Sequence, residues 1–118
     1  MKEEFIPFIK KSETSKIYIE RIMLIEQDLR KIVILTEEGE YSKYGKLAEL
    51  SKYLDGRFFQ CHNSYIINMD KVIRMREQTI FFENGYTIMI SRDKFTFAKQ
   101  CFANYILSKS GNLKGLMI

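Results

Sequence analysis

Short apolar and β-branched runs, separated by polar turns, dominate the pattern along the chain. Residues 31–36 (KIVILT) are an unbroken run of this kind, which is typical of a strand. Asn84-Gly85 lies between two alternating segments and is a strong hairpin signal. The predicted strands cover residues 17–27 (interrupted near Glu20 and Arg21), 31–36, 41–44, 64–68, 72–76, 79–82 and 86–90.

Two segments change to the spacing of a helix. Leu47, Leu50 and Leu54 are spaced for one face of a short central helix. A longer C-terminal helix is predicted from the N-cap Ser91 to about Leu107. Because the strands are short and linked by hairpins, we expect a predominantly β (α+β) fold. It would be an elongated antiparallel sheet domain with a short central helix and a C-terminal helix.

The 118 residues suit a single domain, and the 46% apolar content excludes disorder of the whole chain. We expect residues 1–14 to be an extended lead-in with one strand at most. Residues 15–107 would form the domain, and residues 108–118 a frayed tail. No run approaches the ~18 apolar residues of a membrane helix. The start, Met-Lys-Glu-Glu, lacks the apolar run of a signal peptide, so we expect a cytoplasmic protein with no membrane partner.

The sequence does not indicate an enzyme. Cys61 and His62 are neighbours on an extended segment, so their side chains point to opposite faces and cannot form a catalytic pair. There is no glycine-rich phosphate loop, and one histidine with two cysteines gives too few ligands for zinc. We expect no activity, metal or cofactor. A cytoplasmic location would keep Cys61 and Cys101 reduced, and the expected burial of Cys61 argues against a redox role.

The net charge of +4 is unevenly distributed. Residues 1–41 carry seven Lys/Arg against nine Asp/Glu, residues 42–76 seven against three, and residues 77–118 five against three. The excess of positive charge in the middle and C-terminal parts is compatible with a polyanionic partner. Charge alone favours the simpler interpretation that it serves solubility.

The segment Phe58-Phe59-Gln60-Cys61-His62-Asn63-Ser64-Tyr65-Ile66-Ile67-Asn68 joins two aromatic residues to a polar tetrad and an apolar strand. We expect a rigid polar loop over residues 60–63, held between buried aromatic and apolar residues. The Asn63 amide can pair with the N6/N7 edge of adenine in the major groove. Alternatively, Asn63 and Ser64 satisfy backbone groups of a turn, and the residues alone favour this second interpretation.

This same segment closely resembles the signature of LytTR domains, the DNA-binding output modules of many bacterial response regulators in two-component systems. Tyr44-Gly45-Lys46-Leu47, Asp55-Gly56-Arg57 and Ile88-Met89-Ile90-Ser91-Arg92 extend the resemblance over roughly residues 15–107. It implies an elongated β fold whose loops enter successive major grooves of double-stranded DNA. Two copies would bind direct repeats to regulate transcription, and a receiver domain or regulatory protein would control them.

The resemblance also assigns candidate roles to individual residues. Asn63 matches a position that contacts a base edge, Arg30 and Lys31 match the first DNA-contacting loop, and Arg92 matches the arginine after the last strand. Arginine in that first loop favours guanine. The helix starts near Lys46 and Ser91 would offer backbone N–H groups to phosphate. The positions expected near phosphates are Lys46, His62 and Ser91.

Two other hypotheses remain open at this stage. A single-stranded nucleic-acid binder would use Tyr41, Tyr44 and Tyr86 as exposed stacking platforms. A protein-interaction module on the same fold would dock partners on its C-terminal helix. Neither accounts for the Phe-Phe-x-Cys-His-Asn segment as well as duplex DNA binding does.

Overall fold

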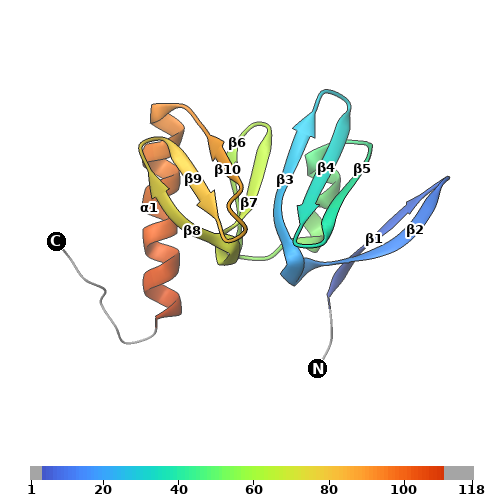
Figure 1. Cartoon of the computed structure of the whole chain (residues 1–118), viewed down its shortest axis with the longest axis horizontal. Coiled ribbons are helices and arrows are strands. Elements are labelled where there is room, and N and C mark those ends of the chain that lie inside the picture. Colours follow the sequence, from blue (N-terminus) through green and yellow to red (C-terminus); the bar gives the residue numbers. More distant parts are fainter. Residues whose placement is uncertain (1–3, 111–118) are drawn as a thin grey trace.

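The computed structural model describes residues 4–110, which form three antiparallel sheets followed by a helix (Figure 1). The sheets have the strand orders β1-β2, β5-β4-β3-β7-β6 and β10-β9-β8. The strands are β1 (Phe5–Lys10), β2 (Glu13–Tyr18), β3 (Ile22–Asp28), β4 (Lys31–Thr36), β5 (Gly39–Tyr44), β6 (Phe58–His62), β7 (Tyr65–Asn68), β8 (Val72–Arg76), β9 (Thr79–Phe82) and β10 (Thr87–Met89). The helical segments are η1 (Ile19–Arg21), η2 (Leu47–Tyr53), η3 (Met69–Lys71) and α1 (Arg92–Lys109).

The five-stranded sheet is the middle layer, and its central strand β3 is apolar on both faces. Leu24 packs in one hydrophobic core and its neighbour Ile25 in the other. Strand β7 repeats this division with Ile67 and Ile66. Successive side chains of a strand point to opposite faces, so an unbroken apolar run such as residues 22–25 fits a strand covered on both sides.

One core lies between the middle sheet, the three-stranded sheet and α1. Helix α1 contributes Phe95, Ala98 and Phe102, whose spacing puts them on one face. The other core lies beneath the β1–β2 hairpin and η2. Figure 1 shows the layers side by side along the long axis, which is the elongated antiparallel β fold that the sequence predicted. In the described part of the chain, no helix has the length and hydrophobicity needed to cross a membrane.

The N-terminal segment differs from the predicted lead-in. Residues 5–18 form the two-stranded hairpin β1–β2, with Phe5 opposite Tyr18. Ile6 and Phe8 are almost fully buried in the second core. Because truncation of a buried phenylalanine costs about 3–5 kcal/mol, this hairpin is part of the fold. The sequence did not indicate this hairpin, because its turn residues are Lys11 and Ser12 and include neither Gly nor Asn-Gly.

The predicted helices are present, with one difference in type. The central one, η2, is a 3₁₀ helix of seven residues that buries Leu47 and Leu50. Helix α1 has Ser91 at its N-cap position, as expected, although the Ser91 hydroxyl makes no capping hydrogen bond. The tail predicted from Gly111 onward lies outside the described residues.

The expected polar loop at residues 60–63 is mostly strand. Gln60, Cys61 and His62 belong to β6, and the turn itself consists of Asn63 and Ser64. A register shift between Gln60 and His62 marks a bulge that turns Cys61 into the first core, where it is 4% exposed. The two preceding aromatics are half-buried rather than fully buried.

Candidate nucleic-acid interface

Three segments that are distant in sequence meet at one edge of the molecule. Figure 1 shows the β3–β4 turn, the β6–β7 turn and the first turn of α1 along the upper edge of the layers. The exposed Arg30, Asn63 and Arg92 belong to these three segments in turn. The hairpins reach this edge because β3, β4, β6 and β7 are neighbouring antiparallel strands of one sheet.

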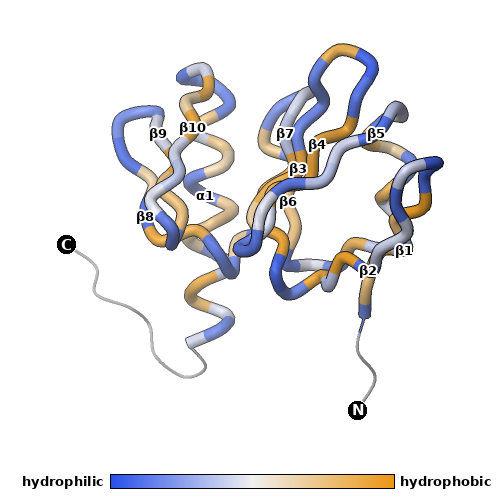
Figure 2. The backbone as a smooth tube through the Cα atoms, turned by 45° about the vertical axis from the view of Figure 1, so that its right-hand side comes forward, coloured by the Kyte–Doolittle hydropathy of each residue, from blue (hydrophilic) through white to orange (hydrophobic). Residues whose placement is uncertain are grey.

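The β3–β4 turn is tight, because Asp28 at the end of β3 pairs with Lys31 at the start of β4. Leu29 adopts a left-handed conformation with φ of 58° and is 91% exposed at the tip. Figure 2 shows this hydrophobic tip between hydrophilic flanks. Arg30 and Lys31 are both exposed beside it, so two cations stand at the end of this hairpin.

Lys46 lies next to this turn. The backbone N–H of Gly45 donates to the Arg30 carbonyl oxygen at 2.9 Å, and Arg30 and Lys46 line the same hollow. A Cβ atom on Gly45 would lie 3.0 Å from both Glu49 and Ile32, and its φ of 153° is also unfavourable for other residues. Glycine here therefore permits the close approach that places Lys46 beside Arg30.

Gln27 joins these elements through its side-chain amide. Its Nε2 donates to the carbonyl oxygens of Leu29, Lys31 and Gly45 at 2.9–3.2 Å. Its Oε1 accepts from the backbone N–H of Leu47 at 3.0 Å. The sequence analysis missed Gln27, since its partners Gly45 and Leu47 are eighteen and twenty residues away and no local pattern indicates them.

The β6–β7 turn exposes the Asn63 side chain and fixes His62 beside it. The Ser64 backbone N–H donates to Nδ1 of His62 at 3.1 Å. An Nδ1 that accepts a hydrogen bond leaves the proton of the neutral ring on Nε2. His62 thus presents an N–H donor, which is the polarity a phosphate oxygen needs.

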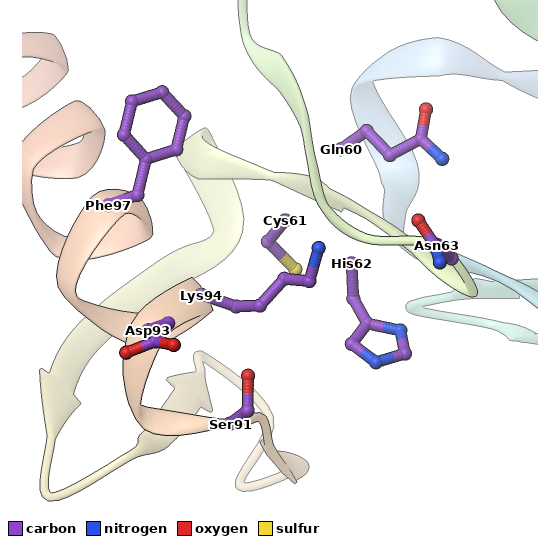
Figure 3. A pocket seen from close by; sticks show the side chains of 8 residues that line it. All are labelled: Gln60, Cys61, His62, Asn63, Ser91, Asp93, Lys94 and Phe97. Atoms are coloured by element: carbon purple, nitrogen blue, oxygen red, sulfur yellow. The ribbon is translucent and has the colours of Figure 1, made fainter.

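A hollow of about 710 Å³ separates this turn from the start of α1, and it brings three predicted residues together. His62 and Asn63 line it from the turn and Ser91 from the helix start. In Figure 3, Lys94 of α1 reaches across toward Cys61 and His62. Lys94 was not among the predicted residues, although its position two residues after Arg92 in a basic helix start was a usable signal.

Burial keeps the cysteine of this hollow in its thiol form. Burial raises the pKa of Cys61 from 9.0 to about 11, so the reactive thiolate is scarce at neutral pH. Both Cys61 and Cys101 are free cysteines. The hollow therefore combines a polar rim with an inert sulfur on its floor.

The start of η2 does not offer backbone N–H groups to phosphate as the sequence analysis expected. The Lys46 N–H donates to the Glu49 carboxylate at 3.2 Å, and the Leu47 N–H is held by Gln27. The first N–H donors of this short 3₁₀ segment are bonded within the protein, so only the side-chain ammonium of Lys46 is left to offer positive charge here.

Carboxylates also lie near this edge. Burial, together with the nearby Asp28 and Glu40, raises the pKa of Glu26. Burial and Glu26 likewise raise the pKa of Tyr65. Glu26 and Asp28 of β3 and Glu40 of β5 thus place negative charge on the sheet near this edge.

Comparison with known proteins identifies the family. The family model of the LytTr DNA-binding domain matches residues 12–102. The chain belongs to the LytTr DNA-binding domain family. A solved LytTr DNA-binding domain of a putative methyl-accepting/DNA response regulator from Bacillus cereus has the same fold. Its TM-score is 0.70 at 17% identity, over 83% of this chain and 95% of that one.

Curated relatives of the LytTr chain include two staphylococcal regulators. Accessory gene regulator protein A of Staphylococcus epidermidis is 32% identical over 81 residues, which cover 64% of this chain and 34% of the relative. The Staphylococcus aureus protein of the same name is 31% identical over 85 residues, which cover 69% and 35%. The chain thus spans about a third of these relatives. Family membership supports DNA binding in transcription regulation.

Proposed function

We propose that this LytTr domain binds double-stranded DNA sequence-specifically to regulate transcription in the bacterial cytoplasm. The β3–β4 and β6–β7 turns would enter successive major grooves, and the start of α1 would contact the duplex between them. The observation that carries this proposal is the common edge shared by the three predicted segments (Figure 1). Loops from one rigid sheet can contact one face of a duplex together.

Each residue has a role suited to its chemistry. Asn63 would pair with a base edge, and Arg30, Lys31 and Arg92 would contact bases from the other two segments. Lys46, His62 and Ser91 would contact phosphates, which fix the register of the protein on the duplex. Among residues 4–110, the exposed Asn63 side chain has no hydrogen bond to the backbone of its turn, which supports its role, because a turn asparagine with a purely structural task would bond its own backbone.

The arrangement on DNA is part of the proposal. One chain carries one set of turns, so a site of two direct repeats would hold two copies side by side. The relatives are about three times as long as the matched region. A receiver domain or a separate regulatory protein would supply the control.

The other two hypotheses have less support. Tyr41 is half-buried with its ring 5.5 Å from that of Phe8, whereas a stacking platform needs a free face. Of the three tyrosines, Tyr44 is the most exposed, at 73%.

On α1 the exposed Phe97 and Ile106 are nine residues apart, which is two and a half turns. They lie on opposite sides of the helix and form no single docking patch.

The experiment compares Asn63→Ala with the wild-type chain on a cognate duplex and on duplexes of mixed sequence. Loss of a bidentate base contact should cost on the order of 1–3 kcal/mol on the cognate site and much less on mixed DNA. Asn104→Ala is the matched control, since Asn104 is exposed on α1, away from the turns. Equal weakening on both kinds of duplex would contradict base contact by Asn63.

A further inference from the structure

Four lysines from three strands and a turn surround one groove next to the β3–β4 turn. The groove has a volume of about 550 Å³ and lies between the tip of the β1–β2 hairpin and strands β4 and β5. We call it the lysine groove, defined by Lys10, Lys11, Lys31 and Lys43. Its other lining residues are Ile9, Ser12, Ser42 and Tyr44, so no carboxylate is among them.

The hairpin tip is held in place by one of these lysines. The Lys10 ammonium donates to the Ser42 carbonyl oxygen at 2.9 Å, which ties the end of β1 to the edge strand β5. The ammonium groups of Lys10 and Lys43 also lie over the ring of the buried Phe8, at 5.6 and 5.9 Å from its centre. The groove is therefore a formed feature of the fold, with a positive charge fixed on each wall.

The charges of the groove are not neutralised within the protein. Among residues 4–110, the ion pairs involve other side chains, and none joins a lysine of the groove to a carboxylate. Glu13, which pairs with Lys10 across the hairpin, instead accepts a hydrogen bond from the Ser15 hydroxyl at 2.7 Å. Four uncompensated cations around one groove favour an anionic ligand.

The lysine groove continues the surface of the β3–β4 turn. Lys31 and Tyr44 line both this groove and the adjacent hollow that holds Leu29 and Arg30. Arg30 in turn lines the hollow of Lys46. Basic side chains thus follow one another from Lys46 across the turn to the hairpin tip, with the carboxylates of Glu49 and Asp28 beside them in the two hollows.

We propose that the lysine groove binds the phosphate backbone of the duplex that flanks the groove entered by the β3–β4 turn. This rests on the proposed function and extends it to the β1–β2 hairpin. A duplex seated on the turn presents rows of phosphates beside the contacted bases, and the lysine groove borders the turn through Lys31. Such contacts add affinity and orientation without sequence information.

The experiment measures how the affinity of the whole chain for a fluorescein-labelled mixed-sequence duplex falls with NaCl concentration. Lys11→Gln/Lys43→Gln removes two charges from the groove but keeps the Lys10 hydrogen bond to Ser42. The double variant Lys99→Gln/Lys109→Gln is the matched control, because it removes the same number of charges from α1. Each lost phosphate contact should reduce the slope of log K against log[salt] by about 0.9.

We expect the slope of the groove variant to be shallower than that of the wild-type chain by about 1.8, and that of the control by less than half as much. Cognate and mixed duplexes should be weakened by the same factor. Equal slopes for the two variants, with wild-type binding intact, would overturn the lysine groove alone. Failure of the wild-type chain to bind any duplex at low salt would overturn the proposed function as well. Thermal unfolding curves of each variant verify that it is folded.

Discussion

The backbone N–H of Gln27 donates to the carbonyl oxygen of Ser64 at 2.8 Å, and this bond joins the two hairpins of the interface. Ser64 follows Asn63 in the β6–β7 turn, while the Gln27 side chain holds the β3–β4 turn and the start of η2. One residue near the end of β3 therefore fixes both turns relative to each other. Preorganised contacts of this kind reduce the cost of ordering loops when a partner binds.

Gln27→Met is expected to loosen the β3–β4 turn. Methionine has a similar length but no amide, so the Gly45 carbonyl and the Leu47 N–H lose their partner. Partly buried hydrogen bonds left unmade cost about 1–3 kcal/mol, and unfolding in urea measures this loss. Amide hydrogen exchange should accelerate at Leu47, and affinity for duplex DNA should fall. Unchanged exchange at Leu47 would contradict the positioning role of Gln27.

Asn68 and Asn63 stand five residues apart in the same motif and differ in task. Asn68 is 0% exposed, donates from Nδ2 to the Ile22 carbonyl at 2.7 Å and accepts from the Asp70 N–H at 2.9 Å. Asn68→Ala should therefore lower the free energy of unfolding by about 1–3 kcal/mol. The exposed Asn63→Ala should change it by less than about 0.5 kcal/mol. Chemical unfolding of both variants tests this contrast, and equal losses would refute it.

Tyr105 gives the stability a dependence on alkaline pH. Its hydroxyl donates to Asp70 at 2.5 Å, and burial together with this hydrogen bond raises its pKa from 10.0 to about 12. A raised pKa means that the contribution is complete below pH 10 and disappears as the pH rises through 12. The difference in melting temperature between wild type and Tyr105→Phe should be constant up to pH 10 and shrink above it. Parallel curves across the whole range would contradict this assignment.

The sequence was sufficient for much of the fold because β-rich domains display their periodicity locally. The run at residues 31–36 and the Asn84-Gly85 turn correspond to β4 and to the connection from β9 to β10. The N-terminal hairpin was missed because its turn has no glycine or asparagine. The burial of Cys61 was expected, but its place on a strand was not, because its neighbours are polar and a bulge that redirects one side chain leaves no periodic trace.

The candidate site was less predictable from the sequence than the fold. The resemblance assigned roles to Asn63, Arg30 and Arg92, and these roles stay predictions. Positioning by Gln27 was not predictable, since it arises from contacts between segments eighteen or more residues apart. The lysine groove was hidden for a related reason. Residues 1–41 carry a net charge of −2, from seven basic and nine acidic residues, yet folding brings Lys10 and Lys11 beside Lys43.

The most direct test of the account is the binding of the whole chain to a random duplex library at ~100 mM salt, where specific contacts outlast most non-specific ones, followed by sequencing of the bound fraction. We predict enrichment of two short direct repeats spaced by about one helical turn, so that two copies bind the same face of the duplex. If DNA is bound but no sequence motif is enriched, base contact by the turns would be contradicted. An absence of binding even after the salt is lowered would contradict duplex DNA as the partner.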